Sequence, residues 1–209
     1  MGRNRLYLLS ALVAVGLIAT VLYSGILVNL NVPTAYELEL GEYRSTKDQF
    51  LRNSPQTPIP EHIRLAFQGL KYYPANPKWK LKATFARRVQ VNDRPTIAED
   101  SDLKLAGVLY FQVDSGQDSL LAYWQQPDRF DELFVPFRDA TNGKGTYAGG
   151  RYLNLRYVEG DSVEIDFNKA YNPLCAYNPL TVCPLPPPAN TLKYQVEAGE
   201  KEFSLKSRL

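Results

Sequence analysis

Residues 134–198 constrain the fold more than any other part of the chain, because almost every polar side chain there lies beside an aromatic residue, a glycine or a proline. Proline fixes the backbone, and glycine permits conformations that other residues avoid. A solvated surface segment has no need of such a composition. The segment therefore predicts a fixed polar site, although it does not identify what the site acts on.

The first 30 residues have the pattern of a membrane anchor. Arg3 and Arg5 precede a stretch, residues 6–30, that carries no charged side chain. About 24 residues at about 1.5 Å each reach about 36 Å, which exceeds a hydrocarbon core of about 30 Å. A cleaved signal peptide would have a shorter apolar region that ends in small residues. The pattern therefore predicts one uncleaved transmembrane helix within residues 1–30.

Charge predicts the orientation of this anchor. The two arginines precede it, whereas Glu37, Glu39 and Glu42 follow it, and the positive end of a span stays in the cytoplasm. We therefore expect a single-pass protein of a bacterial inner membrane with a periplasmic C-terminal domain. Without the two arginines, 22 of the 24 basic residues remain against 22 acidic residues. Such a neutral domain gives no electrostatic reason to bind nucleic acid.

Hydrophobic periodicity divides the rest into a linker with a short helix, residues 31–60, and a β-rich domain, residues 61–209. The first helix is expected to begin near Ser45 and a second to cover residues 61–69. Alternating apolar residues predict strands at residues 81–91, 103–113, 119–125, 132–137, 151–158, 162–167 and 191–198. This pattern indicates a mainly β protein (β-rich α+β), an antiparallel sandwich or a partly closed barrel with two short N-terminal helices, preceded by the transmembrane helix.

Motifs between residues 47 and 201 are similar to those of one known family. The most specific ones are residues 137–141 and 150–153, and further matches are residues 166–168, 170–173, 175–178, 183–187, Asn190 and 198–201. With these motifs the chain resembles the family catalogued as domain of unknown function 1684, which is found mainly in bacteria. The resemblance implies a domain but no activity, and it does not include the predicted anchor.

Polar side chains of these motifs form the candidate ligand-binding site, and they are Arg138, Asp139, Thr141, Arg151, Asp166, Asn168, Tyr171, Asn172 and Asn190. Because two predicted strands end beside these residues, we expect them to converge at one end of the sheet. Two interpretations remain for the charged members. They form a buried ion-pair network that closes the fold, or their guanidinium groups grip a small anionic ligand. The asparagines are also typical of turns.

Cys175 and Cys183 enclose seven residues in a compartment expected to be oxidising, which predicts a disulfide. Zinc is an alternative, but it would need two more ligands, and the only histidine, His62, is distant in the sequence. Free thiols are the third interpretation. No metal site and no cofactor are predicted.

Two classes of function fit these features. The favoured one is a binding or assembly module, an accessory subunit that meets other membrane-protein subunits through the small residues of its helix. The alternative is a periplasmic hydrolase that uses Asp139 and Asp166 together with Arg138 and Arg151. Serine is sparse and histidine is absent in residues 134–198, so an enzyme is the less favoured interpretation.

Overall fold

The computed structural model describes residues 13–17, 20, 33–87, 103–114, 116–126, 129–158 and 160–203. Two compact units make up the chain, Met1–Leu38 and Glu39–Leu209. All the described strands lie in the second unit, and so do the residues of the candidate site.

Helix α2 (Ala35–Asn53) begins well before Ser45, so the predicted start of this helix is wrong. Its cap is Thr34, whose hydroxyl accepts the N–H of Glu37 at 3.2 Å, while the Glu37 carboxylate accepts the N–H of Thr34 at 2.7 Å. This reciprocal pair is a capping box. The hydrogen bond from the Thr34 backbone, followed by that from its hydroxyl, lowers the pKa of Glu37.

The predicted membrane anchor is not supported. Most of residues 6–30 lies outside the described residues, and no helix in the described part of the chain is long and apolar enough to cross a membrane. Of residues 6–30, only residues 13–17 and 20 are described, and they are helical. The longer helix α2 carries charged residues along its length. The predictions of a transmembrane helix and of a single-pass inner-membrane location with a periplasmic domain are therefore wrong.

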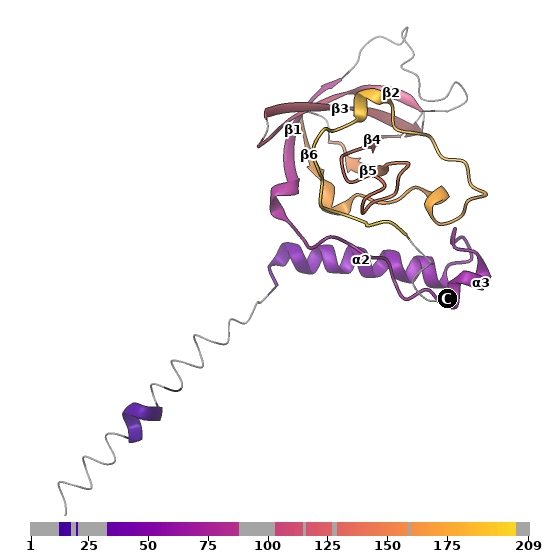
Figure 1. The fold of residues 1–209 in the computed structure, drawn as a ribbon. Coiled ribbons are helices and arrows are strands. Elements are labelled where there is room, and N and C mark those ends of the chain that lie inside the picture. Colours follow the sequence, from indigo (N-terminus) through magenta and orange to yellow (C-terminus); the bar gives the residue numbers. More distant parts are fainter. Residues whose placement is uncertain are drawn as a thin grey trace, which may run out of the picture. The chain divides into compact units, whose positions relative to one another are not determined.

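Six strands form one antiparallel sheet in the order β5-β4-β3-β2-β1-β6 (Figure 1). Their bounds are β1 (Lys80–Arg87), β2 (Lys104–Val113), β3 (Gly116–Gln126), β4 (Arg129–Phe137), β5 (Arg151–Arg156) and β6 (Ser162–Asp166). The two edge strands, β5 and β6, contact each other, so the sheet is a nearly closed barrel. Of the two architectures expected from the sequence, the structure has the barrel.

Alternating burial follows from the period-two pattern of the strands. In β1, Ala83 and Phe85 face the interior, and in β2, Leu109 and Phe111 do the same. Apolar side chains from all six strands fill the interior of the barrel. The interior is therefore a packed core, and the polar motif residues must be sought at its ends and on its outer surface.

Coil and short 3-10 helices follow β6, namely η2 (Phe167–Lys169), η3 (Leu174–Ala176) and η4 (Pro188–Asn190), while η1 (Pro77–Trp79) precedes β1. The strand predicted at residues 191–198 is not formed. Thr191 makes one parallel bridge with Arg138, and the N–H of Leu192 donates to the Arg138 carbonyl at 2.8 Å. The outer edge of β5 is bridged instead by Tyr171, which pairs with Tyr152, so residues 191–198 do not extend the sheet there.

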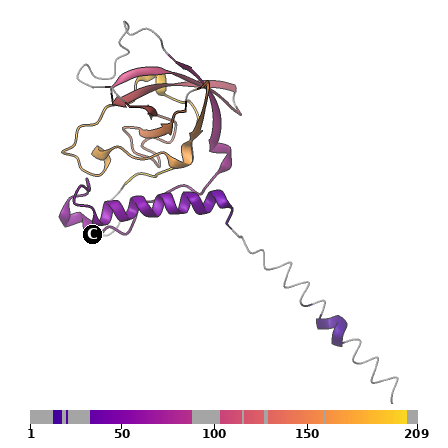
Figure 2. The same cartoon turned by 180° about the vertical axis from the view of Figure 1, so that it is seen from behind.

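Helix α2 lies along the segments that follow β6, as both views of the ribbon show for residues 39–53 (Figures 1 and 2). Leu51 of this helix forms a small second core with Ile59, Phe67 and Tyr177. The helix predicted at residues 61–69 is only one turn, α3 (Glu61–Arg64), because the chain must leave it to bury Phe67 in this core.

Candidate functional site

Arg151, the first residue of β5, is completely buried (0% exposed) and paired with Asp139. Its Nη2 lies 2.8 Å from Asp139 Oδ2 and donates to the Val196 carbonyl at 2.9 Å, while its Nη1 donates to the carbonyls of Ala198 and Glu200. Burial lowers the pKa of Arg151, and the charge of Asp139 opposes that shift. All these partners belong to the protein, which favours a fold-closing network over an anion-binding fork.

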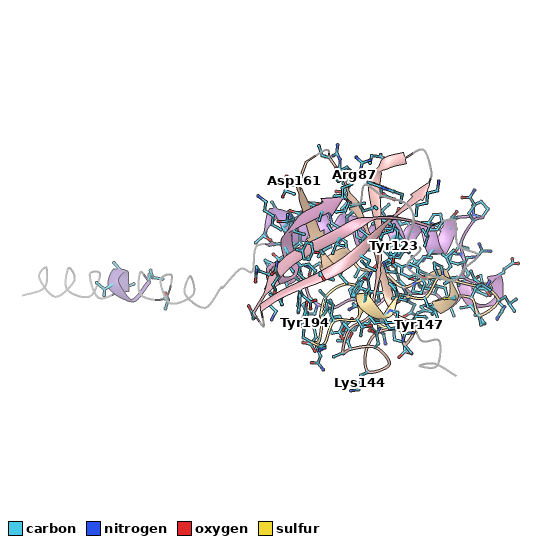
Figure 3. The ribbon with its side chains drawn as sticks, turned by 90° about the horizontal axis from the view of Figure 1, so that it is seen from above. Arg87, Tyr123, Lys144, Tyr147, Asp161 and Tyr194 are labelled. Atoms are coloured by element: carbon cyan, nitrogen blue, oxygen red, sulfur yellow. The ribbon has the colours of Figure 1, made fainter. Side chains whose placement is uncertain are left out.

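Asp139 also organises the turn that follows β4. Its Oδ1 accepts the N–H and the hydroxyl of Thr141 at 2.8 and 2.6 Å. The Thr141 hydroxyl lies 2.8 Å from the hydroxyl of Thr146. Lys144 at the tip of this turn projects away from the barrel (Figure 3). The side chain of Thr141 is therefore buried within the turn rather than open to a ligand.

Arg138 does not join this network. Phe137 lies on the interior side, with its ring centroid 5.3 Å from the Arg151 guanidinium carbon. Arg138 is the next residue, so its side chain starts on the opposite face of the sheet. Its buried Nε has no hydrogen-bond partner among the described residues. The side chains of Arg138 and Arg151 therefore start on opposite faces of the sheet, whereas they had been expected to converge at one end of it.

The side-chain amides of Asn168 and Asn190 each form a pair of hydrogen bonds with the backbone N–H and carbonyl of one distant residue. Asn168 accepts the N–H of Asn76 and donates to its carbonyl, both at 2.9 Å. Asn190 pairs in the same way with Leu121, at 2.7 and 2.9 Å. Asp166 accepts the N–H of Asn168 at 3.0 Å and so orients this residue. These two side-chain amides satisfy partly buried backbone groups of distant segments, which is a structural role.

The remaining predicted residues, Tyr171 and Asn172, lie beside the carboxylate of Glu200, which is not among the predicted site residues. Glu200 is only 1% exposed although it is charged. Its Oε2 accepts the N–H of Asn172 at 2.8 Å and the hydroxyl of Tyr177 at 2.5 Å. Its Oε1 lies 2.5 Å from Nζ of Lys47 on α2. One oxygen is thus held by neutral donors, and the other is paired with an ammonium group by charge and proximity, without the geometry of a hydrogen bond.

An aromatic ring lies beside this ammonium group, and a second ring binds the neighbouring arginine of α2. Lys47 Nζ lies 4.5 Å from the centroid of the Tyr171 ring, within the range of a cation–π interaction. Tyr72 is opposite Glu200 in an antiparallel bridge, so both side chains leave the backbone on the same side. The guanidinium carbon of Arg44, also on α2, lies 4.5 Å from the Tyr72 ring centroid. We call the following residues the Glu200 site: Tyr72, Tyr171, Asn172, Tyr177 and Glu200.

Burial keeps the tyrosines of this region protonated. Loss of hydration raises the pKa of Tyr72 and Tyr177 well above the usual range, and the negative charge of Glu200 raises it further. Loss of hydration also raises the pKa of Tyr43 and of Tyr123 to about 12. Protonated at neutral pH, the Tyr177 hydroxyl can act as a donor to the carboxylate.

We expect stability to fall as the pH rises from about 10 to about 12. Tyrosines of an unfolded chain ionise near pH 10, whereas Tyr43 and Tyr123 keep their protons to about pH 12 in the folded protein. The folded state binds more protons in this interval, so stability that is fully present below about pH 10 is lost through it. Denaturant unfolding at a series of pH values, with tyrosinate absorbance followed in parallel, measures this loss.

Tyr123→Phe is the control for this prediction, because the buried Tyr123 hydroxyl (Figure 3) has no hydrogen-bond partner among the described residues. The variant should be at least as stable as the parent at neutral pH and should lose less stability in alkali. Ionisation of all tyrosines near pH 10 with the fold intact would contradict the prediction.

Cys175 and Cys183 are free thiols, so the predicted disulfide is wrong. The N–H of Cys175 donates to Sγ of Cys183 at 3.0 Å. Burial, followed by a hydrogen bond with the Cys175 side chain, raises the pKa of Cys183 to about 11. A protonated thiol is a poor nucleophile and a poor metal ligand. Within the described part of the chain, no group of three or more His, Cys, Asp or Glu side chains is placed to hold a metal ion.

These features define a class of small antiparallel barrel in which polar motif residues fasten the coil segments that close it. The chain belongs to the family described as "Protein of unknown function (DUF1684)", whose model matches residues 65–201. The resemblance drawn from the motifs is thus confirmed for the family.

A solved structure with the same fold is the solution NMR structure of an uncharacterised protein from Haloarcula marismortui. It is 36% identical, with a TM-score of 0.66, and the match covers 82% of this chain and 96% of that one. No curated protein matches the chain.

Proposed function

We propose that the protein is a binding module that recognises an ammonium group at the Glu200 site. The position of Lys47 carries this proposal. Its Nζ lies between the Glu200 carboxylate, at 2.5 Å, and the face of the Tyr171 ring, at 4.5 Å from the centroid. An aromatic face and a carboxylate together favour an ammonium group. Lys47 therefore indicates the chemistry that this site accepts.

Unused hydrogen-bonding capacity in the Glu200 site supports the proposal. The Tyr72 hydroxyl and Asn172 Oδ1 are buried and have no hydrogen-bond partner among the described residues. An unpaired buried polar group costs free energy, and an ammonium group offers three N–H donors. A ligand that brings an ammonium group and further polar atoms would satisfy groups that Lys47 leaves unpaired.

The geometry favours this binding module over the hydrolase considered from the sequence. Asp139 is the buried partner of Arg151, whereas Asp166 orients Asn168, so the two carboxylates belong to different networks. A small anionic ligand at Arg151 is also not favoured, because both terminal nitrogens already donate hydrogen bonds to backbone carbonyls and Asp139.

We expect Lys47→Ala to be less stable than the parent protein and to regain stability in propylammonium. The substitution removes Cγ, Cδ, Cε and Nζ, which correspond to the heavy atoms of propylammonium, and it leaves the Glu200 carboxylate without its cation. Because the Lys47 side chain is 20% exposed, the loss should fall between about 1 kcal/mol for exposed pairs and about 3–5 kcal/mol for buried pairs. Thermal unfolding over a series of propylammonium concentrations measures both effects.

Lys169→Ala is the matched control, because Lys169 forms a more exposed ion pair with Glu39 at 2.7 Å. Propylammonium should not stabilise this variant. Propanol, which has the same size without the charge, should not stabilise Lys47→Ala. Glu200→Gln in the Lys47→Ala background should abolish the rescue. Equal stabilisation of the parent, Lys47→Ala and Lys169→Ala by propylammonium would contradict the proposed site.

A further inference from the structure

We infer that α2 is a displaceable cover of the Glu200 site, and that the partner which displaces it presents a helix with a lysine three residues after an arginine. This inference rests on the proposed function, and it adds the regulation of the site and the chemistry of its partner.

The buried face of α2, which packs against the coil segments of the second unit, is polar at its centre. Buried leucines, Leu40 and Leu51, lie at its two ends. Four polar side chains lie between them on the same face, Tyr43, Arg44, Lys47 and Asp48. A helix that is a permanent part of a core normally presents a continuous apolar stripe. The pattern of α2 is therefore unusual for a permanently packed helix.

Each of these four side chains uses a polar group to contact residues outside α2. Asp48 Oδ1 accepts the N–H of Leu70 at 3.0 Å, and the Tyr43 hydroxyl donates to the Lys169 carbonyl at 3.4 Å. The other two make the cation–π contacts and the ion pair described above. Water can replace such contacts, so separation of α2 exposes less apolar surface than separation of an apolar helix face would.

The spacing of Arg44 and Lys47 determines which partner fits. The two cations are three residues apart, and each lies 4.5 Å from the ring centroid of a tyrosine, Tyr72 for Arg44 and Tyr171 for Lys47. A partner helix with the same spacing would bring its arginine to the first ring and its lysine to the second ring and Glu200. A small amine would satisfy only the second position, so it should compete less well than such a helix.

A fluorescent peptide with the sequence of residues 35–53 is the probe for this inference, and the full chain is the receptor. We expect the parent chain to bind the peptide weakly, because its own α2 competes as an intramolecular ligand. The Lys47→Ala chain should bind it at least about tenfold more tightly, because its own helix has lost the ion pair. A peptide that carries Lys47→Ala should bind neither chain at comparable concentrations.

The outcomes separate this inference from the proposed function. If neither chain binds the peptide while propylammonium still stabilises Lys47→Ala, the displaceable cover is overturned and the ammonium site stands. If propylammonium also fails, both are overturned. Equal binding of the two peptides would overturn the inference as well. If Lys47→Ala does not fold, Lys47→Met keeps an apolar stem without the charge, and the comparison of peptide binding is made with that chain.

Hydrogen exchange of the parent chain gives an independent measure. With the parent peptide in excess, backbone amides of residues 39–53 should exchange faster, whereas those of β2 and β3 should not change. Unchanged protection of residues 39–53 at saturating peptide would overturn the inference.

Discussion

Replacing Arg151 by alanine is expected to lower the free energy of unfolding by about 3–5 kcal/mol. The substitution leaves Asp139 buried without its cation, and it removes the donors that the carbonyls of Val196, Ala198 and Glu200 now use. Denaturant unfolding of the parent and the variant, analysed with a common slope, measures the change.

Arg138→Ala is the control for this prediction. Arg138 is the neighbouring arginine, and its side chain makes no ion pair or hydrogen bond with the described residues. Its removal should cost about 1 kcal/mol or less. Arg151→Lys should fall between the two, because one ammonium group cannot reproduce the fork of the guanidinium. A loss at Arg151 no larger than that at Arg138 would show that the network does not hold the fold.

The second large effect is expected at Gly199, whose φ of +73° lies in the left-handed region. A Cβ at this position would lie 2.5 Å from the carbonyl oxygen of Ala170 and 2.8 Å from that of Phe167, and backbone atoms cannot move aside easily. The left-handed conformation should cost about 1–2 kcal/mol and the overpacking about 1–3 kcal/mol. Gly199→Ala should therefore lose about 2–5 kcal/mol in denaturant unfolding.

Gly143→Ala separates these two contributions. Gly143 has nearly the same φ, +71°, but the nearest atom to a Cβ there is 3.8 Å away, on Ala148. Only the conformational cost of about 1–2 kcal/mol is expected. Equal losses at Gly143 and Gly199 would show that the close approach of Ala170 and Phe167 has no energetic consequence.

Local periodicity located the strands of the barrel but not its closure. Burial on one face repeats every second residue, so β1 to β6 can be recognised within a few residues of their bounds. Residues 191–198 were expected to form a strand too, yet they make only one bridge, between Thr191 and Arg138, while Tyr171 pairs with the outer edge of β5. Whether a neighbour is free to pair is a property of the whole sheet, which no local window contains.

The candidate site shows a similar division. Its motif residues are indeed buried polar groups with defined partners, but most of those partners are backbone atoms, which a sequence does not display. Glu200 belongs to one of the motifs near the C-terminus, whereas Lys47, with which it forms an ion pair, lies far from it in the sequence, on α2. The predicted disulfide depended on the compartment inferred from the anchor, so one error led to the other. Arg138 and Arg151 lie on different faces because successive side chains along a strand point to opposite faces of the sheet, and it is Phe137 that pairs with Arg151.

The Arg151 network also determines when the barrel can be completed during synthesis. The backbone carbonyls that accept hydrogen bonds from the Arg151 guanidinium lie 45 to 49 residues further along the chain. When β5 emerges from the ribosome, these acceptors have not yet been made, and the guanidinium must remain hydrated. We therefore expect the end of the barrel at Arg151 to close last, once residues 196–200 are available.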